Sequence, residues 1–122
     1  MGTKVAYAGT QKTIDLFVEA DGSCPAEEFL NSLSQSDRRK VDVLFERMAQ
    51  HGRISNAEKF KKLEGSKEVW EFKSFQIRLL CFHAPGKKVV ICKGIIKKRD
   101  KHAKADIEFA EACREKFFGE QS

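Results

Sequence analysis

The sequence predicts an α+β fold: a strand and a helix hairpin, then an antiparallel β meander, then a C-terminal helix. Apolar residues recur at helical spacing within residues 25–52 and alternate with polar residues after residue 69. Turn-forming pairs such as Pro85-Gly86 interrupt the alternating stretches. The 122 residues have the length of one domain, and 41% hydrophobic with 34% charged residues indicates a folded protein. We expect a single domain over residues 1–122, with an ordered core at about 13–117.

The N-terminal part is expected to hold a strand followed by a short helix. Residues 13–20 alternate imperfectly and end at Asp21-Gly22, which is typical of a strand that runs into a turn. Pro25 suits the first position of a helix. Glu27 and Glu28 follow it, where their charge favours the positive end of the helix dipole.

A second helix is expected from about residue 37, because Ser34 or Ser36 can cap its N-terminus. Gly52 is typical of the position that follows the last helical residue. We expect the two helices to form a short antiparallel hairpin. The second helix carries an amphipathic stripe of residues at helical spacing: Val41, Leu44, Phe45 and Met48.

The C-terminal half is expected to form a loop, three antiparallel strands and a helix. Residues 53–68 are polar and basic with little periodicity, which predicts a loop. The final helix is expected at about 105–117. The three strands are expected at 69–73, 76–83 and 88–96, joined by turns at Ser74-Phe75 and Pro85-Gly86.

These turns predict which residues lie opposite one another in the meander. A turn at Ser74-Phe75 places Glu71 opposite Arg78, and one at Pro85-Gly86 places Arg78 opposite Lys93. Because side chains alternate between the faces of a sheet, Glu71, Arg78 and Lys93 share one face, and Lys97 continues it. The other face is expected to be apolar and covered by the helices; it carries Trp70, Phe72, Ile77, Leu79, Cys81, Val90, Cys92 and Ile96.

The charge balance favours a polyanionic partner. There are 23 Lys and Arg against 18 Asp and Glu, which gives a net charge of +5 and a pI of about 9.1. Such a pI is typical of nucleic-acid-binding domains. A basic run at residues 93–104 leaves the charged face of the predicted sheet, and Lys59, Lys61 and Lys62 form a weaker second cluster.

Several classes of protein are disfavoured. The N-terminus lacks the apolar run of a signal peptide, and no stretch approaches the roughly 20 apolar residues of a membrane span. The four cysteines form no CxxC pair, and the three histidines make no HxxxH or HExxH pattern. We therefore expect a cytoplasmic protein with no metal site, no cofactor and no membrane partner.

Arg78 has two readings. It forms a structural cross-strand ion pair with Glu71, or its guanidinium fork is offered to a phosphate. Lys93 favours the second reading, because two neighbouring cations repel each other unless an anion lies between them. His102, in the basic run, is the residue there that can exchange a proton near neutral pH.

Residues 13–117 resemble the RelE/ParE toxin superfamily, and more closely its HigB-like, phage-derived branch. The resemblance rests on the order of elements and on four segments: PAEEFLNSL, KFKKLEGSKEVWEFK, QIRLLCF and VVICKGIIKKRDKHAKADIEFAEACRE. Residues 99–103 replace the K-K-T-x-K-T-P pattern that the branch commonly has, so its proline is missing. Ile96 stands where the branch has an aromatic residue, and the only tyrosine is Tyr7.

The resemblance implies the toxin of a type II toxin–antitoxin system, an endoribonuclease (mRNA interferase) that cleaves translated mRNA at the ribosome. A helix-turn-helix antitoxin is the implied protein partner. Attack by the RNA's own 2′-hydroxyl needs a base, an acid and cations, but no metal. We expect Arg78 and Lys98 to stabilise the phosphate and His102 to transfer protons, with Glu71 in support. The expected RNA-binding residues are Lys93, Lys97, Arg99 and Lys62.

Two other functions remain open at this point. A ParE-like toxin shares the fold but inhibits DNA gyrase without cutting nucleic acid. An inactive relative retains only the binding of an antitoxin or a nucleic acid. Cleavage of mRNA by the purified protein distinguishes the expected enzyme from both.

Overall fold

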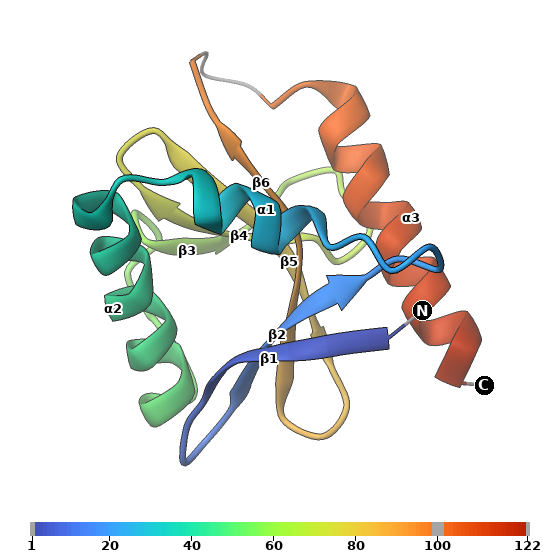
Figure 1. Ribbon diagram of the computed structural model, residues 1–122, viewed down its shortest axis with the longest axis horizontal. Coiled ribbons are helices and arrows are strands. Elements are labelled where there is room, and N and C mark those ends of the chain that lie inside the picture. The colour runs from blue at the N-terminus through green and yellow to red at the C-terminus, as the bar shows by residue number, and fades with distance from the viewer. Residues whose placement is uncertain (1, 99–101, 122) are drawn as a thin grey trace.

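The computed structural model describes residues 2–98 and 102–121, and shows a six-stranded sheet with helices on both faces (Figure 1). The strand order is β1-β2-β6-β5-β4-β3; β2 and β6 run parallel and the other neighbours run antiparallel. The predicted α+β fold class is confirmed. The elements are β1 (Gly2–Ala8), β2 (Thr13–Val18), α1 (Pro25–Ser32), α2 (Gln35–His51), β3 (Phe60–Lys62), β4 (Trp70–Ser74), β5 (Ile77–Ala84), β6 (Lys88–Ile96) and α3 (Lys104–Gln121).

Two strands were not predicted from the sequence. β1 pairs antiparallel with β2 at one edge of the sheet, ahead of residue 13. β3 lies at the other edge, within the stretch expected to be a loop. Both are edge strands that leave much of their surface in solvent, and Val5 of β1 is 62% exposed. An edge strand buries little, so its sequence shows little of the alternation that reveals a buried strand.

The helix boundaries follow from local chemistry. Pro25 occupies the start of α1, and two acidic residues lie in its first turn, as predicted. Of the two candidate caps for α2, Ser34 is the one used: its Oγ accepts a hydrogen bond of 3.1 Å from the backbone N–H of Asp37. Gly52 ends α2 in the left-handed conformation at φ 81°.

The sheet has an apolar core on each of its two faces, whereas the sequence predicted an apolar core on one face only. α1 and α2 cover the face that carries Phe72, Leu79 and Ile91. α3 covers the other face, where Leu80, Phe82 and Val90 pack against Ala110, Cys113 and Phe117. Charged residues lie at both ends of this second face: Glu71 and Arg78 near the start of α3, and the ion pair of Asp15 with Lys88 at the other end. No helix in the described part of the chain is both long and apolar enough to cross a membrane.

The predicted register of the first hairpin is wrong. The turn lies at Phe75-Gln76 and not at Ser74-Phe75, so Lys73 lies opposite Arg78, while Glu71 lies opposite Leu80. Moving a two-residue turn by one position changes each cross-strand partner by two residues. A shift of two preserves the faces, because side chains alternate with a period of two. Glu71 and Arg78 therefore do share a face, as diagonal neighbours.

The second hairpin also departs from the predicted register. Its loop has three residues, Pro85–Lys87. Farther along the hairpin the pairing is irregular: Cys81 lies opposite Ile91, but the adjacent Leu80 lies opposite Lys93, so β6 has one extra residue between these pairs. Arg78 consequently lies opposite Ile95 and not opposite Lys93. The extra residue is Cys92, which packs with Val90 under α3. Val90 and Cys92 thus lie on the face opposite to the predicted one, whereas Lys93 remains on the face of Arg78.

Phe72 gives a direct test of this packing. Its ring is buried between α2 and β3 and contacts Phe45 and Phe60, with ring centroids 5.5 and 4.8 Å away. We expect Phe72→Ala to lower the free energy of unfolding by about 3–5 kcal/mol in denaturant titration, as for other large core aromatics. Val5→Ala, at an exposed edge position, is the control and should change it by less than about 0.5 kcal/mol. Equal effects of the two substitutions would contradict the described core.

Candidate active site

A buried carboxylate lies where β4, β5 and the start of α3 meet. Glu71 has no solvent exposure, and its two oxygens face different cationic or ionisable partners. Its Oε2 is hydrogen-bonded to His102 Nε2, and its Oε1 lies 4.0 Å from Arg78 Nε. The side chains of His102 and Arg78 are themselves only 4% and 13% exposed. Glu71 reaches this face because its neighbours on β4, Trp70 and Phe72, point into the opposite core.

Arg78 is held by the turn that precedes it. Its Nη1 donates to the backbone carbonyls of Phe75 and of Ile77, the latter at 3.0 Å. Together with Glu71, these contacts fix the guanidinium in one orientation. Both readings of Arg78 are therefore compatible with the geometry: it is an ion-pair partner of Glu71, and Nη2 stays available to an anion, since Nη1 is occupied and Nε is buried.

His102 is oriented by Glu71. An ionised carboxylate only accepts hydrogen bonds, so Nε2 of His102 is the donor. The other ring nitrogen, Nδ1, is buried and has no hydrogen-bond partner among the described residues. A histidine whose one nitrogen is fixed by a carboxylate leaves the other to exchange a proton, which is the arrangement of a general base positioned by a third group. The sequence did not predict this pairing, since 31 residues separate the two side chains.

Lysines surround the carboxylate. Lys61 of β3 lies opposite Glu71, and Lys73 lies opposite Arg78, so both share the face of the site. The backbone N–H of Lys97 donates to Gln76 at 2.7 Å, which anchors the end of β6 to the β4–β5 turn. Partial burial lowers the pKa of Lys97, and Arg78, Lys61 and Lys73 lower it further, while the charge of Glu71 acts in the opposite direction. Cations thus outnumber the single buried carboxylate, which is the electrostatic condition for binding an anion.

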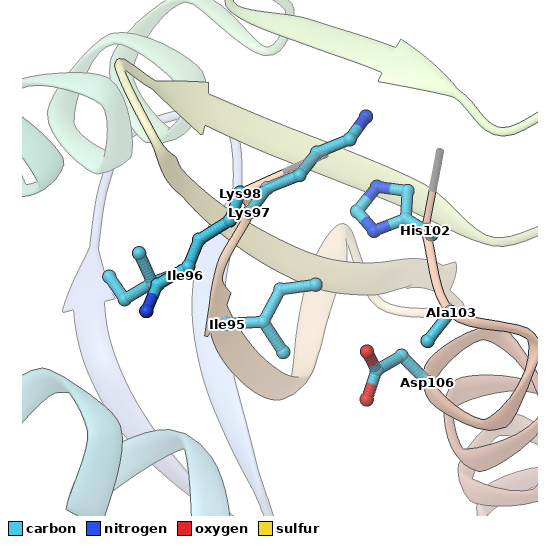
Figure 2. A pocket seen from close by; sticks show the side chains of 7 residues that line it. All are labelled: Ile95, Ile96, Lys97, Lys98, His102, Ala103 and Asp106. Carbon is cyan, nitrogen blue, oxygen red and sulfur yellow. The ribbon is translucent and has the colours of Figure 1, made fainter. Parts of the chain in front are cut away.

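An open pocket of about 220 Å³ lies beside this cluster, between the end of β6 and the start of α3. Figure 2 shows His102 and Asp106 on the α3 side of the pocket, and the side chains of Lys97 and Lys98 diverging from the end of β6. Lys97, Lys98 and His102 therefore line the same pocket. The lining residues are Ile95, Ile96, Lys97, Lys98, His102, Ala103 and Asp106.

The structure brings together most of the residues that the sequence singled out. Glu71, Arg78, Lys97, Lys98 and His102 lie around the pocket and the buried carboxylate. Lys61 and Lys73 join them: Lys73 follows Glu71 by two residues on β4 and so shares its face, whereas Lys61 lies on β3, a strand that was not predicted. Arg99, expected to bind RNA, lies outside the described residues.

Two predicted RNA-binding lysines have other partners. Lys93 forms a 2.9 Å ion pair with Asp106 and lies over the ring of Phe109, so it fastens the first turns of α3 to β6. Lys62 lies opposite Trp70, on the far face of β3, where it forms a 2.9 Å ion pair with Glu68. The structure therefore does not bring Lys62 to the site. In the described ranges, no three His, Cys, Asp or Glu side chains come close enough to hold a metal ion.

The architecture and the comparisons together define the class of the protein. The N-terminal strands and helices, the antiparallel meander and the C-terminal helix agree with the RelE-like α+β fold. The model of the family described as phage derived protein Gp49-like (DUF891) matches residues 28–115, so the chain belongs to that family. This is a family of RelE/HigB-type toxins of toxin–antitoxin systems, which implies an antitoxin partner. No curated protein matches the chain.

The buried carboxylate should contribute to folding as well as to the site. Glu71→Ala leaves Arg78 and His102 without their charged partner, and we expect it to lower the free energy of unfolding by about 3–5 kcal/mol, as for other broken buried pairs. Asp42→Ala, which removes the exposed partner of Arg38, is the control and should leave the unfolding midpoint nearly unchanged. A Glu71→Ala protein as stable as this control would show that the carboxylate does not hold the site together.

Proposed function

We propose that the chain is a type II toxin that cleaves mRNA as a metal-independent endoribonuclease, acting on translated mRNA at the ribosome. The observation that carries this proposal is the placement of His102 and Arg78 on one buried carboxylate, within a cluster of lysines and beside an open pocket. Membership in a toxin family supports the biological role. The excess of positive charge supports a polyanionic substrate.

The phosphate is bound by the cations at the rim of the site. Arg78 presents Nη2, because its Nη1 donates to two backbone carbonyls and its Nε is buried, and the N–H groups of Nη2 can donate to a phosphate oxygen. Lys98 is exposed at the pocket and adds a second positive charge. As the 2′-hydroxyl attacks, negative charge grows on the phosphate oxygens, and fixed cations stabilise it more than they stabilise the ground state.

Proton transfer falls to His102 and Lys97. His102 takes the proton of the attacking 2′-hydroxyl; because its Nδ1 is buried, this requires the hydroxyl to enter the pocket that His102 lines, and Glu71 stabilises the imidazolium that forms. The bond from the 2′-oxygen to phosphorus forms and the bond to the 5′-oxygen breaks. Lys97, whose pKa is lowered, supplies the proton that the leaving 5′-oxygen needs. The products carry a 2′,3′-cyclic phosphate and a 5′-hydroxyl, and every step uses the chain's own residues.

Arg78→Lys separates the catalytic role of Arg78 from its structural one. A lysine keeps the positive charge near Glu71 but loses the planar fork. We expect a folded protein whose rate of mRNA cleavage in a cell-free translation reaction falls roughly 100- to 1000-fold, as when one charge-stabilising donor is lost. Growth arrest on induction should disappear with it. Arg39→Lys, at an exposed position of α2, is the matched control and should cleave at the wild-type rate. Full activity of Arg78→Lys would reduce Arg78 to a scaffold residue.

The chemistry of the ends tests the mechanism independently of any variant. We expect the 5′ fragments to end in a 2′,3′-cyclic or 3′-phosphate, because the nucleophile is the RNA's own hydroxyl. An RNA with a single 2′-deoxyribose at the cleavage position should resist cutting there. Toxin treated with EDTA and freed of the chelator before it is added to the cell-free translation reaction should cleave at an unchanged rate, since Arg78 and the lysines provide the positive charge. Fragments with 3′-hydroxyl ends would refute this mechanism, and no cleavage at all would favour a gyrase inhibitor or an inactive relative.

A further inference from the structure

We propose that Phe75, at the tip of the β4–β5 turn, is a stacking platform for an unpaired RNA base beside the candidate active site. The inference rests on the proposed ribonuclease function and adds the contact that holds the base of the substrate. Phe75 is 71% exposed, more than any other large apolar side chain among the described residues. It lies outside both cores, so folding does not explain why a large aromatic ring occupies this position.

The backbone presents the ring in a fixed position. Phe75 has a positive φ of 55°, a conformation that non-glycine residues with bulky side chains rarely adopt. Retaining an aromatic residue there is unfavourable for folding, and such strain is most often found at functional positions. The carbonyl of Phe75 accepts from Arg78 Nη1, and the carbonyl of Gln76 accepts from Lys97. The turn is therefore tied to two residues of the candidate site, and the ring is placed relative to them.

The surroundings of the ring are cationic. Lys40 Nζ lies 4.5 Å from the ring centroid and Lys59 Nζ lies 5.9 Å from it. An open hollow of about 190 Å³ adjoins the ring, lined by side chains of α2 and of the β4–β5 turn. Its lining contains three basic side chains and no carboxylate: Lys40, Val43, Leu44, Arg47, Lys59, Ser74 and Phe75.

An aromatic ring among cations is suited to single-stranded RNA. Every base has a π-face that can stack on phenylalanine, and the neighbouring phosphates need positive charge. Exposed lysine–ring contacts are weak, so an arriving base can displace an ammonium group, which then pairs with a phosphate. An aromatic anchor at the core of a protein interface would be expected to have few charged neighbours, because that core is depleted of charged residues. The three basic side chains around the ring therefore favour RNA over a protein partner.

The test measures binding without cleavage. The probe is a labelled single-stranded RNA with 2′-O-methyl groups on every ribose, compared with the same strand carrying abasic sites. We expect the wild type to bind the base-containing strand roughly 5- to 100-fold more tightly than the abasic one, the range for one stacked base. Phe75→Ala should remove most of this preference, and Phe75→Trp should retain it. Both variants keep a Cβ, so backbone strain at φ 55° is matched. Val5→Ala, exposed on β1, is the control for loss of an apolar surface group.

The outcomes separate this inference from the proposed function. Equal binding of the two strands by the wild type, or an unchanged preference in Phe75→Ala, overturns the platform. If Phe75→Ala then loses affinity for an antitoxin, the ring belongs to a protein interface. A base preference that depends on Phe75, in a protein that leaves mRNA intact in the cell-free translation reaction, supports the platform and refutes the ribonuclease. Cleavage that depends on Arg78 and not on Phe75, in a protein without a base preference, supports the ribonuclease and refutes the platform.

Discussion

The structure depends on a carboxylate that is completely removed from water. An ionised side chain in such a position costs several kcal/mol unless charged and hydrogen-bonding partners compensate it. Glu71 has both, and they come from different parts of the fold: Arg78 from the neighbouring strand and His102 from the segment that enters α3. The same requirement thus fastens α3 to the sheet and orients the two residues that can act on a phosphate. Stability and chemistry share one group, and neither can be altered without the other.

The lysines around Glu71 work against folding and in favour of binding. A single negative charge cannot neutralise Arg78 and the three lysines whose charges act at this end of the sheet. Their mutual repulsion is relieved in the free protein by solvent, and relieved further by a bound polyanion. Lys93 differs from these lysines, because it is paired with Asp106 and holds the start of α3 against β6. The charged row predicted from the sequence is therefore divided between structural and available cations.

The sequence predicted the elements that bury an apolar face or end in a recognisable cap. α1, α2, the three strands of the meander and α3 follow from periodicity, Pro25, Ser34 and Gly52, because local chemistry suffices to define them. It also predicted that Glu71 and Arg78 share a face. It could not predict the Phe75-Gln76 turn or the irregularity at Cys92, since both depend on packing between strands. Lys61 was missed because β3 was not predicted as a strand, and the His102–Glu71 contact spans the whole meander.

The parallel pairing of β2 with β6 has a consequence for the order in which the molecule is made. Thr13 of β2 aligns with Lys88 of β6, so the β1–β2 hairpin keeps one unpaired edge until most of the chain has been synthesised. Contacts so distant in sequence form late, after the entropy of closing the intervening loop has been overcome. His102 emerges later still. A product truncated before residue 88 therefore lacks the strand that joins the β1–β2 hairpin to the meander, and one truncated before residue 102 lacks the partner of Glu71, so the buried carboxylate is compensated only after this last part of the chain has been made.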